Sequence, residues 1–148
     1  MEDLIWVFAV HITCTFALTG LIWYVQLVHY PSFKFIDATQ FHEFHRFHSI
    51  RTSFIVIPLM LAELITGILL VTGLASLFIL HLIGLILIIL IWFSTFFIQV
   101  PQHEALIPDF NPEKAANLIR SNWIRTIAWS FKSILSIYIL LELLENTP

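Results

Sequence analysis

The stretch SLFILHLIGLILIILIWFSTFFIQV, which runs from Ser76 to Val100, contains no Asp, Glu, Lys or Arg. A helix needs roughly 20 apolar residues to cross the hydrocarbon core of a bilayer, and this stretch is long enough. Three further apolar runs of similar length are Leu4 to Val28, Thr52 to Leu74 and Trp123 to Leu144. The sequence therefore predicts an all-α fold, a four-transmembrane-helix bundle that forms one integral-membrane domain over residues 1–148.

The composition excludes several classes of protein. Apolar residues make up 59% of the 148 residues, and a soluble chain of this size would leave large apolar patches in water. The single cysteine, Cys14, excludes a disulfide framework and a thiolate metal cage. No Gly-rich phosphate loop or basic stripe is present, so we expect the lipid bilayer as a partner and no nucleic acid.

Charge predicts the orientation of the chain. Four crossings place the connections after the first and third runs on one side of the membrane, and the hairpin at residues 73–76 on the other. The first of these sides carries Lys34, Arg46, Arg51, Lys114, Arg120 and Arg125. Because cytoplasmic loops are enriched in Lys and Arg, we expect this side to be cytoplasmic and both termini to lie outside.

Each connection on the cytoplasmic side has its own predicted structure. Residues 37–51 contain neither Pro nor Gly, and they predict a short amphipathic helix at the membrane interface with Asp37 as its cap. Pro101 predicts an irregular start to the second connection. Asn111 and Pro112 then predict the cap and the first residue of a short helix.

Histidines gather on the predicted cytoplasmic side. The topology brings His29, His45, His48 and His103, from three separate pieces of chain, to one depth in the membrane. Converging neutral imidazoles suit a transition metal such as Fe, Zn, Mn or Cu. Two other interpretations stay open: the histidines are interfacial residues, or they carry out acid–base chemistry without a metal.

Two charged residues lie deep in the predicted spans. Glu63 and Lys132 fall near the middle of the bilayer, where an unpaired charge is costly, so the two side chains are expected to pair. The alternative is that Glu63 ligates a metal or acts as a general base. Lys132 shares a helical stripe with Asn122, Arg125 and Trp129.

A cavity is expected to run from the histidines towards Glu63. Trp129, Met60 and Phe97 would wall it and would admit a flat or oily molecule from the bilayer. The alternative is that Met60 and Phe97 serve only in packing. His11 and His81 lie at similar depth near the opposite side of the membrane, where such a pair could hold a haem from two sides.

Five stretches of the sequence resemble a group of small bacterial membrane proteins with four spans. They are QLVHYP (26–31), FHRFHSIR (44–51), PLMLAE (58–63), STFFIQVPQH (94–103) and NWIRTIAW (122–129). This resemblance covers nearly the whole chain and implies a place in the bacterial inner membrane. The residues that it carries over are Gln26, His29, His45, His48, Arg51, Glu63, Gln99, His103, Asn122, Arg125 and Trp129.

The segments 100–103 and 122–126 are also similar to those of the anthrone-oxygenase-like membrane family. Members of that family are associated with the oxidation of aromatic polyketide intermediates, so this second resemblance implies an aromatic substrate. The family carries Asn at the position of His103 and lacks the pattern of Phe44 to His48. The additional histidines favour a bound metal in this chain.

Together these features predict a metal-dependent oxidoreductase or oxygenase in the membrane that acts on a lipophilic or aromatic small molecule. The expected metal ligands are His29, His45, His48, His103 and Glu63. The expected catalytic residues are Glu63, which would ligate the metal or move protons, and Arg125 with Asn122, which would orient a polar group of the substrate. The expected cofactor contacts are Gln26, Gln99, Trp129 and Lys132. The alternatives are a non-catalytic metal or haem carrier, a small transporter and a structural subunit, and a homodimer is left open.

Overall fold

The protein is a bundle of long helices, seen in a computed structural model that describes residues 2–73, 77–107 and 110–145. No strand occurs within these residues. The elements in chain order are α1 (Glu2–Tyr24), η1 (Val25–His29), η2 (Pro31–Phe35), α2 (Ala38–Gly73), α3 (Phe78–Ser94), η3 (Thr95–Gln99), α4 (Val100–Leu106) and α5 (Pro112–Glu145). The elements η1 and η3 are single π-helical turns, and η2 is a 3₁₀ helix.

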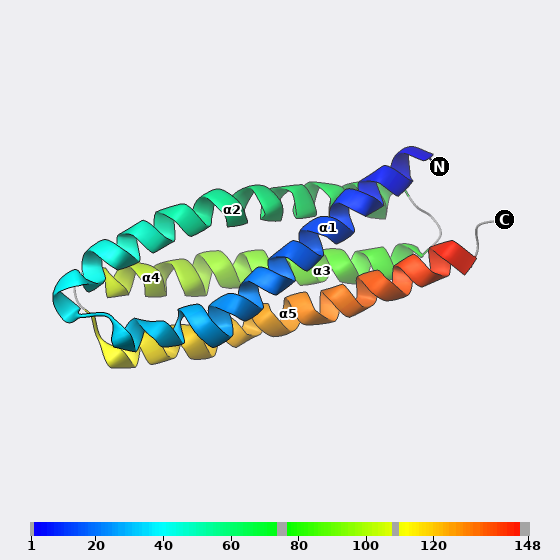
Figure 1. The fold of residues 1–148 in the computed structure, drawn as a ribbon. Helices are drawn as coiled ribbons and strands as arrows, with labels where there is room; N and C mark the ends of the chain where they lie inside the picture. Colours follow the sequence, from blue (N-terminus) through cyan, green and yellow to red (C-terminus); the bar gives the residue numbers. More distant parts are fainter. Residues whose placement is uncertain (1, 74–76, 108–109, 146–148) are drawn as a thin grey trace.

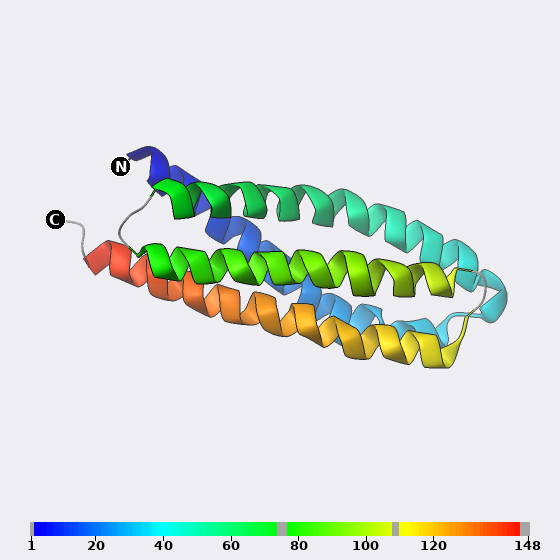
Figure 2. The same cartoon turned by 180° about the vertical axis from the view of Figure 1, so that it is seen from behind.

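Four helices close into a ring. Helix α1 packs against α2 and α5, and α3 packs against the same two helices from the other side (Figure 1). The view from behind shows α3 in front and α1 crossing obliquely at the back (Figure 2). The described residues include four helical segments that are long and apolar enough to cross a membrane: 4–35, 39–73, 78–106 and 112–145. The predicted all-α four-helix bundle is confirmed.

The outer face of the bundle is apolar, and the interior holds polar and charged side chains among apolar ones. Ile79, Phe131 and Ile134 expose more than 60% of their surface, whereas Glu63 and Lys132 are each only 1% exposed. In a soluble protein, large apolar patches on the surface are rare and charged residues are almost always exposed. Lipid tails suit the apolar outer face, and the backbone N–H and C=O groups form hydrogen bonds within the helices. The fold is therefore that of a multi-pass membrane protein.

The first connection differs from the prediction in one respect. Residues 38–51 do not form a separate interfacial helix but are the first part of the continuous helix α2. The predicted cap is correct, because Asp37 Oδ1 accepts hydrogen bonds from the backbone N–H of Thr39 at 2.8 Å and from its hydroxyl at 2.6 Å. No Pro or Gly interrupts the chain between this cap and Pro58, so the helix continues into the second span.

The second connection also differs from the prediction. Residues 100–106 are helical, so the expected irregular start at Pro101 is wrong. Pro101 is the second residue of α4 and follows the π-helical turn η3 after Val100. In the first turn of a helix the missing N–H of proline costs little. Asn111 is a cap as predicted, since its Oδ1 accepts from the N–H groups of Glu113 and Lys114. The helix that it begins is the long α5, however, and not a short separate helix. The expected hairpin at 73–76 lies outside the described residues apart from Gly73, which ends α2.

Candidate functional site

The structure brings together the four histidines that the sequence analysis grouped at one end of the bundle. His29 comes from η1, His45 and His48 from α2, and His103 from α4. The rings of His29 and His48 stack with centroids 3.7 Å apart, and the ring of His103 lies 5.1 Å from that of His45 and 6.4 Å from that of His48. His42, the remaining histidine of this part of α2, is exposed and bonds to the backbone oxygen of Ile107 instead.

A chain of hydrogen bonds joins Tyr30 to two of these histidines. The Tyr30 hydroxyl lies 2.8 Å from His103 Nε2, and His103 Nδ1 lies 2.9 Å from His45 Nε2. Two proton arrangements satisfy this chain: Tyr30 donates and the protons point towards His45, or His45 donates and they point towards Tyr30. Switching between them moves a proton from one end of the chain to the other, so the geometry is that of a proton relay.

Tyr30 was missed by the sequence analysis, although it adjoins His29. Its side chain is 3% exposed and packs between Phe33 and His103. A tyrosine next to a histidine gives no signal of a functional role by itself. The signal would have come from its place after a π-helical turn, since such turns are frequent at functional sites and are not readable from sequence.

The ring nitrogens differ in how far they are satisfied. His48 Nδ1 bonds to the Thr52 hydroxyl at 3.0 Å. By contrast, His29 Nε2 and His45 Nδ1 are buried and have no hydrogen-bond partner. Buried polar atoms are normally paired, so the two unpaired nitrogens mark this cluster as incomplete without a ligand.

The side chains of the cluster are suitable ligands for a transition metal, but their present arrangement is not that of a metal site. Nowhere in residues 2–73, 77–107 or 110–145 do three His, Cys, Asp or Glu side chains surround one point closely enough to hold a metal ion. His29 and His48 are stacked, so their in-plane lone pairs do not converge. The facing nitrogens of His45 and His103 are 2.9 Å apart, close to the roughly 3.4 Å between two ligands of a tetrahedral ion with bonds of about 2.1 Å.

Amide side chains and a guanidinium form a layer beside the histidines. Asn122 donates to Gln26 Oε1 at 2.8 Å, and Gln26 donates in turn to the backbone oxygen of Ile119. Arg125 donates to Asn122 Oδ1 through both Nε and Nη2. Gln99 donates to Ser121 at 2.9 Å. Gln26 and Gln99 therefore hold α5 in place, and their polar atoms are used within this layer rather than by the histidines.

A cavity of about 380 Å³ opens between this layer and the histidines. Its polar wall includes Tyr30, His45, His48, Gln99, His103 and Arg125. Its remaining wall is mainly apolar and includes Met60 and Trp129, as the sequence analysis expected. The third expected wall residue was Phe97, and this expectation is wrong. Phe97 is 69% exposed on the lipid-facing side, and its neighbour Phe96 lines the cavity instead.

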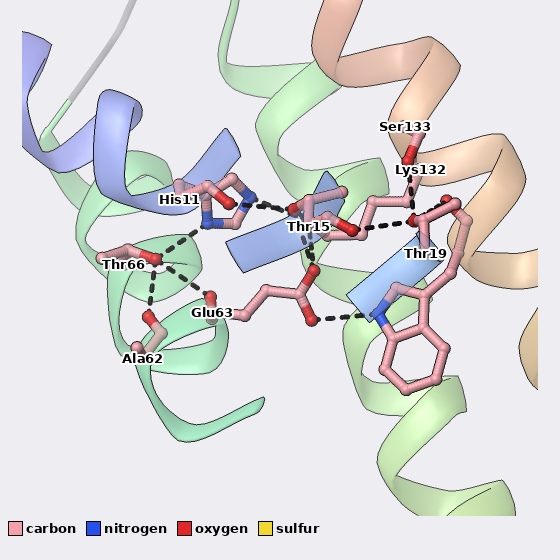
Figure 3. Close-up of polar contacts among 9 residues, drawn as sticks. His11, Thr15, Thr19, Ala62, Glu63, Thr66, Lys132 and Ser133 are labelled. Carbon is pink, nitrogen blue, oxygen red and sulfur yellow. Dashed lines mark hydrogen bonds and ion pairs between the residues drawn. The ribbon is translucent and has the colours of Figure 1, made fainter. Parts of the chain in front are cut away.

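Glu63 belongs to a second polar network, deeper in the membrane. Its carboxylate pairs with the Lys132 ammonium at 3.0 Å and accepts hydrogen bonds from Thr15 and from the indole N–H of Trp129 (Figure 3). Both carboxylate oxygens are thus occupied by groups outside the histidine cluster. Of the two expected roles, the structure shows the pairing with Lys132, and Glu63 is not placed to ligate a metal held by the histidines.

Lys132 has a full set of partners. Besides Glu63, its ammonium donates to the Thr15 hydroxyl at 2.6 Å and to His11 Nε2 at 3.0 Å (Figure 3). His11 Nδ1 then bonds to Thr66 at 2.9 Å, and Thr66 donates to the backbone oxygen of Ala62. Lys132 was expected to contact a cofactor, but its donors are used within this network.

The expected haem site between His11 and His81 has no room for a haem. His11 uses both ring nitrogens within the network, and the space lined by the two histidines measures about 10 Å³. His81 Nε2 is buried without a partner. A space of this size is close to the minimum for a single water molecule.

The fold and the cavity define a class: a helical membrane protein with a ligand-sized pocket whose polar wall is rich in histidine. No protein-family model, curated protein or solved structure matches the chain. The site is therefore interpreted from its own chemistry.

Proposed function

We propose that the protein is an integral-membrane, metal-dependent oxidoreductase that acts on a lipophilic or aromatic substrate held in the cavity. The observation that carries the proposal is the meeting of four imidazoles from three separate pieces of chain. Three of them, His45, His48 and His103, line the polar end of an apolar cavity of about 380 Å³, and His29 stacks on His48. That volume lies within the range of small-molecule sites, which are mostly apolar with a few converging polar groups.

The histidine cluster is the proposed metal site. His45 and His103 face each other with ring nitrogens 2.9 Å apart, and His48 and His29 adjoin them. Tyr30 on His103 and Thr52 on His48 are the partners that would orient the ligating rings. Iron or copper would supply electron-transfer or oxygen chemistry, whereas zinc would supply Lewis-acid chemistry.

The other residues of the cavity bind and orient the substrate. Met60 and Trp129 contact its apolar part, and Arg125, held by Asn122, orients a polar group. The apolar wall keeps bulk water away from the reacting atoms. The similarity to the anthrone-oxygenase-like family and to the bacterial four-span group stays part of the proposal, and it favours an aromatic substrate.

Metal analysis of the purified protein tests the proposal. We expect stoichiometric iron or copper by mass spectrometry, together with a matching absorption spectrum. His45→Ala should lose most of the metal, because His45 is 1% exposed and faces His103. The control is His42→Ala, since His42 is exposed and bonds only to the oxygen of Ile107. Size-exclusion chromatography would show that both variants remain folded. Full metal occupancy in His45→Ala would remove this histidine from the site.

A second candidate function is proton transfer without a metal. The chain from Tyr30 through His103 to His45 supports it, because the two proton arrangements differ by a shift along the same bonds. The same purification separates the candidates: a protein free of metal, with a downfield proton resonance that disappears in Tyr30→Phe, would replace the oxidoreductase by an acid–base site. A Soret band would indicate a haem carrier.

The proposal places the protein in a bacterial inner membrane with the histidine cluster on the cytoplasmic side. Lys34, Arg46, Lys114 and Arg120 lie at that end of the bundle and are all exposed. In a Cys14→Ser background, a cysteine introduced by Lys114→Cys should react with a membrane-impermeant maleimide only after the cells are opened. Labelling in intact cells would reverse the orientation. A homodimer remains compatible with this arrangement.

A further inference from the structure

The guanidinium of Arg125 is buried without an anion. Arg125 is 7% exposed, and the only ion pair within the described residues joins Lys132 to Glu63. Of the residues that the structure describes, Glu104 is the only acidic one on the cavity wall; it is exposed and makes no ion pair with Arg125. A buried charge normally has an opposite charge next to it, because leaving water costs several kcal/mol.

The donors of Arg125 are also incompletely used. Asn122 accepts from Nε and Nη2, whereas the contacts of Nη1 with Thr95 and of Nη2 with Gln99 are both 3.5 Å long. A guanidinium has five N–H groups arranged as a planar fork that matches a carboxylate. Since Arg125 lines the cavity, the N–H groups of Nη1 and Nη2 that make only the 3.5 Å contacts are available to a ligand inside it.

The cavity then defines the chemistry of that ligand. Among the described residues of the wall, Arg125 is the only Lys or Arg and the exposed Glu104 is the only Asp or Glu. The remaining polar side chains, such as Tyr30, Gln99 and the histidines, are neutral. One positive charge balances one negative charge, so a carboxylate fits better than a doubly charged phosphate. The rest of the wall is mainly apolar, which favours a hydrocarbon or aromatic body.

We propose that the cavity binds a lipophilic monocarboxylate whose carboxylate pairs with Arg125 and whose apolar body lies against Met60 and Trp129. This inference rests on the proposed function, because it names the class of substrate for the same cavity. The ligand enters from the bilayer, where long-chain and aromatic carboxylates dissolve. Its charge completes an ion pair for which the described residues supply no anion.

Competition between an acid and its alcohol tests the charge directly. The wild-type protein in phosphatidylcholine nanodiscs would be loaded with 11-(dansylamino)undecanoic acid and followed by dansyl fluorescence. Oleate should displace the probe at a concentration about tenfold lower than oleyl alcohol, as expected for one charge-assisted pair. Equal displacement by acid and alcohol would overturn the inference. Displacement by phosphatidic acid at the same concentration as oleate would also overturn it.

Variants locate the charge. Arg125→Gln should weaken binding of the dansyl acid about tenfold or more, with Arg125→Lys in between. Arg120→Gln is the matched control, because Arg120 lies on the same helix, is exposed and loses the same charge. Unchanged binding in Arg125→Gln would overturn the inference, while the wild-type comparison holds even if this variant misfolds.

Metal content measured on the same samples separates the two proposals. Acid binding through Arg125 in a metal-free protein would end the oxidoreductase proposal and leave the carboxylate site standing. A metal-loaded protein that binds acid and alcohol equally would end the carboxylate site alone. We expect Arg125→Gln to retain the wild-type metal content, since no histidine of the cluster bonds to Arg125 within the described residues.

Discussion

Lys132 and Arg125 are two buried cations on the same helix, two turns apart, and they are treated in opposite ways. Lys132 has Glu63 at 3.0 Å and two further neutral partners, Thr15 and His11. Arg125 has only neutral partners and faces a cavity of about 380 Å³. The space beside Lys132 is about 10 Å³. The network around Lys132 is thus a closed region, whose polar groups bind one another. The cavity beside Arg125 is an open region that a ligand can enter.

This difference distinguishes buried polar residues that stabilise the fold from those that are available to a ligand. A charge that is balanced within the protein holds helices together and needs nothing from outside. A charge balanced only by neutral groups, in a cavity that is also lined by His45 with its unpaired Nδ1, is stable only with a ligand or at a cost to the fold. Intramembrane ionisable residues are often taken as functional, and here the packing shows which one is available.

Breaking the closed network should produce the largest effect on stability. Glu63→Gln leaves the Lys132 ammonium buried without its counter-ion, and we expect a loss of about 3–5 kcal/mol in the free energy of unfolding. The measurement is unfolding by SDS in bicelles, followed by tryptophan fluorescence. The double variant Glu63→Gln with Lys132→Met should recover most of the loss, because both charges are gone.

The matched change in the open region should cost much less. Arg125→Gln removes a charge without leaving an opposite charge unpaired. The expected loss in the free energy of unfolding is therefore about 1 kcal/mol, from the hydrogen bonds to Asn122. Equal losses in Glu63→Gln and Arg125→Gln would show that both regions are structural. The proposed difference between the region around Lys132 and the region around Arg125 would then be wrong, whatever the stability of the wild type.

Much of the closed region could be predicted from the sequence. The four apolar runs give the helix count, and the 1.5 Å rise per residue places Glu63 and Lys132 at one depth. Their pairing follows from the cost of an isolated charge in lipid. The meeting of His29, His45, His48 and His103 also follows from topology, because two connections on the same side bring their residues to one end of the bundle.

The details of the open region could not be predicted, because they depend on local backbone geometry. The π-helical turns η1 and η3 shift the helical register around Gln26 and Gln99, and this shift decides which neighbour faces inward. Phe96 lines the cavity and Phe97 faces lipid for that reason. The role of Tyr30 depends on the path of the chain through η1 and η2, which no periodic pattern records.

Two glycines test the same comparison with a smaller effect. A Cβ at Gly67 would lie 2.9 Å from Ile88 Cδ1 and 3.3 Å from His11 Cε1, whereas a Cβ at Gly20 would meet nothing within 4 Å. Ile88 ends in a flexible methyl group, but His11 is fixed by bonds to Thr66 and Lys132 and cannot move without breaking the network.

We therefore expect Gly67→Ala to lose about 1–2 kcal/mol in the free energy of unfolding through overpacking, despite the better helix propensity of alanine. Gly20→Ala adds the same methyl group at an exposed position. It should leave the free energy of unfolding unchanged or raise it by up to about 1 kcal/mol. Both follow from the same SDS titration. If Gly67→Ala were as stable as Gly20→Ala, His11 would be free to shift. The network around Lys132 would then be an adaptable site rather than a closed one, and the distinction from the pocket of Arg125 would rest on charge alone.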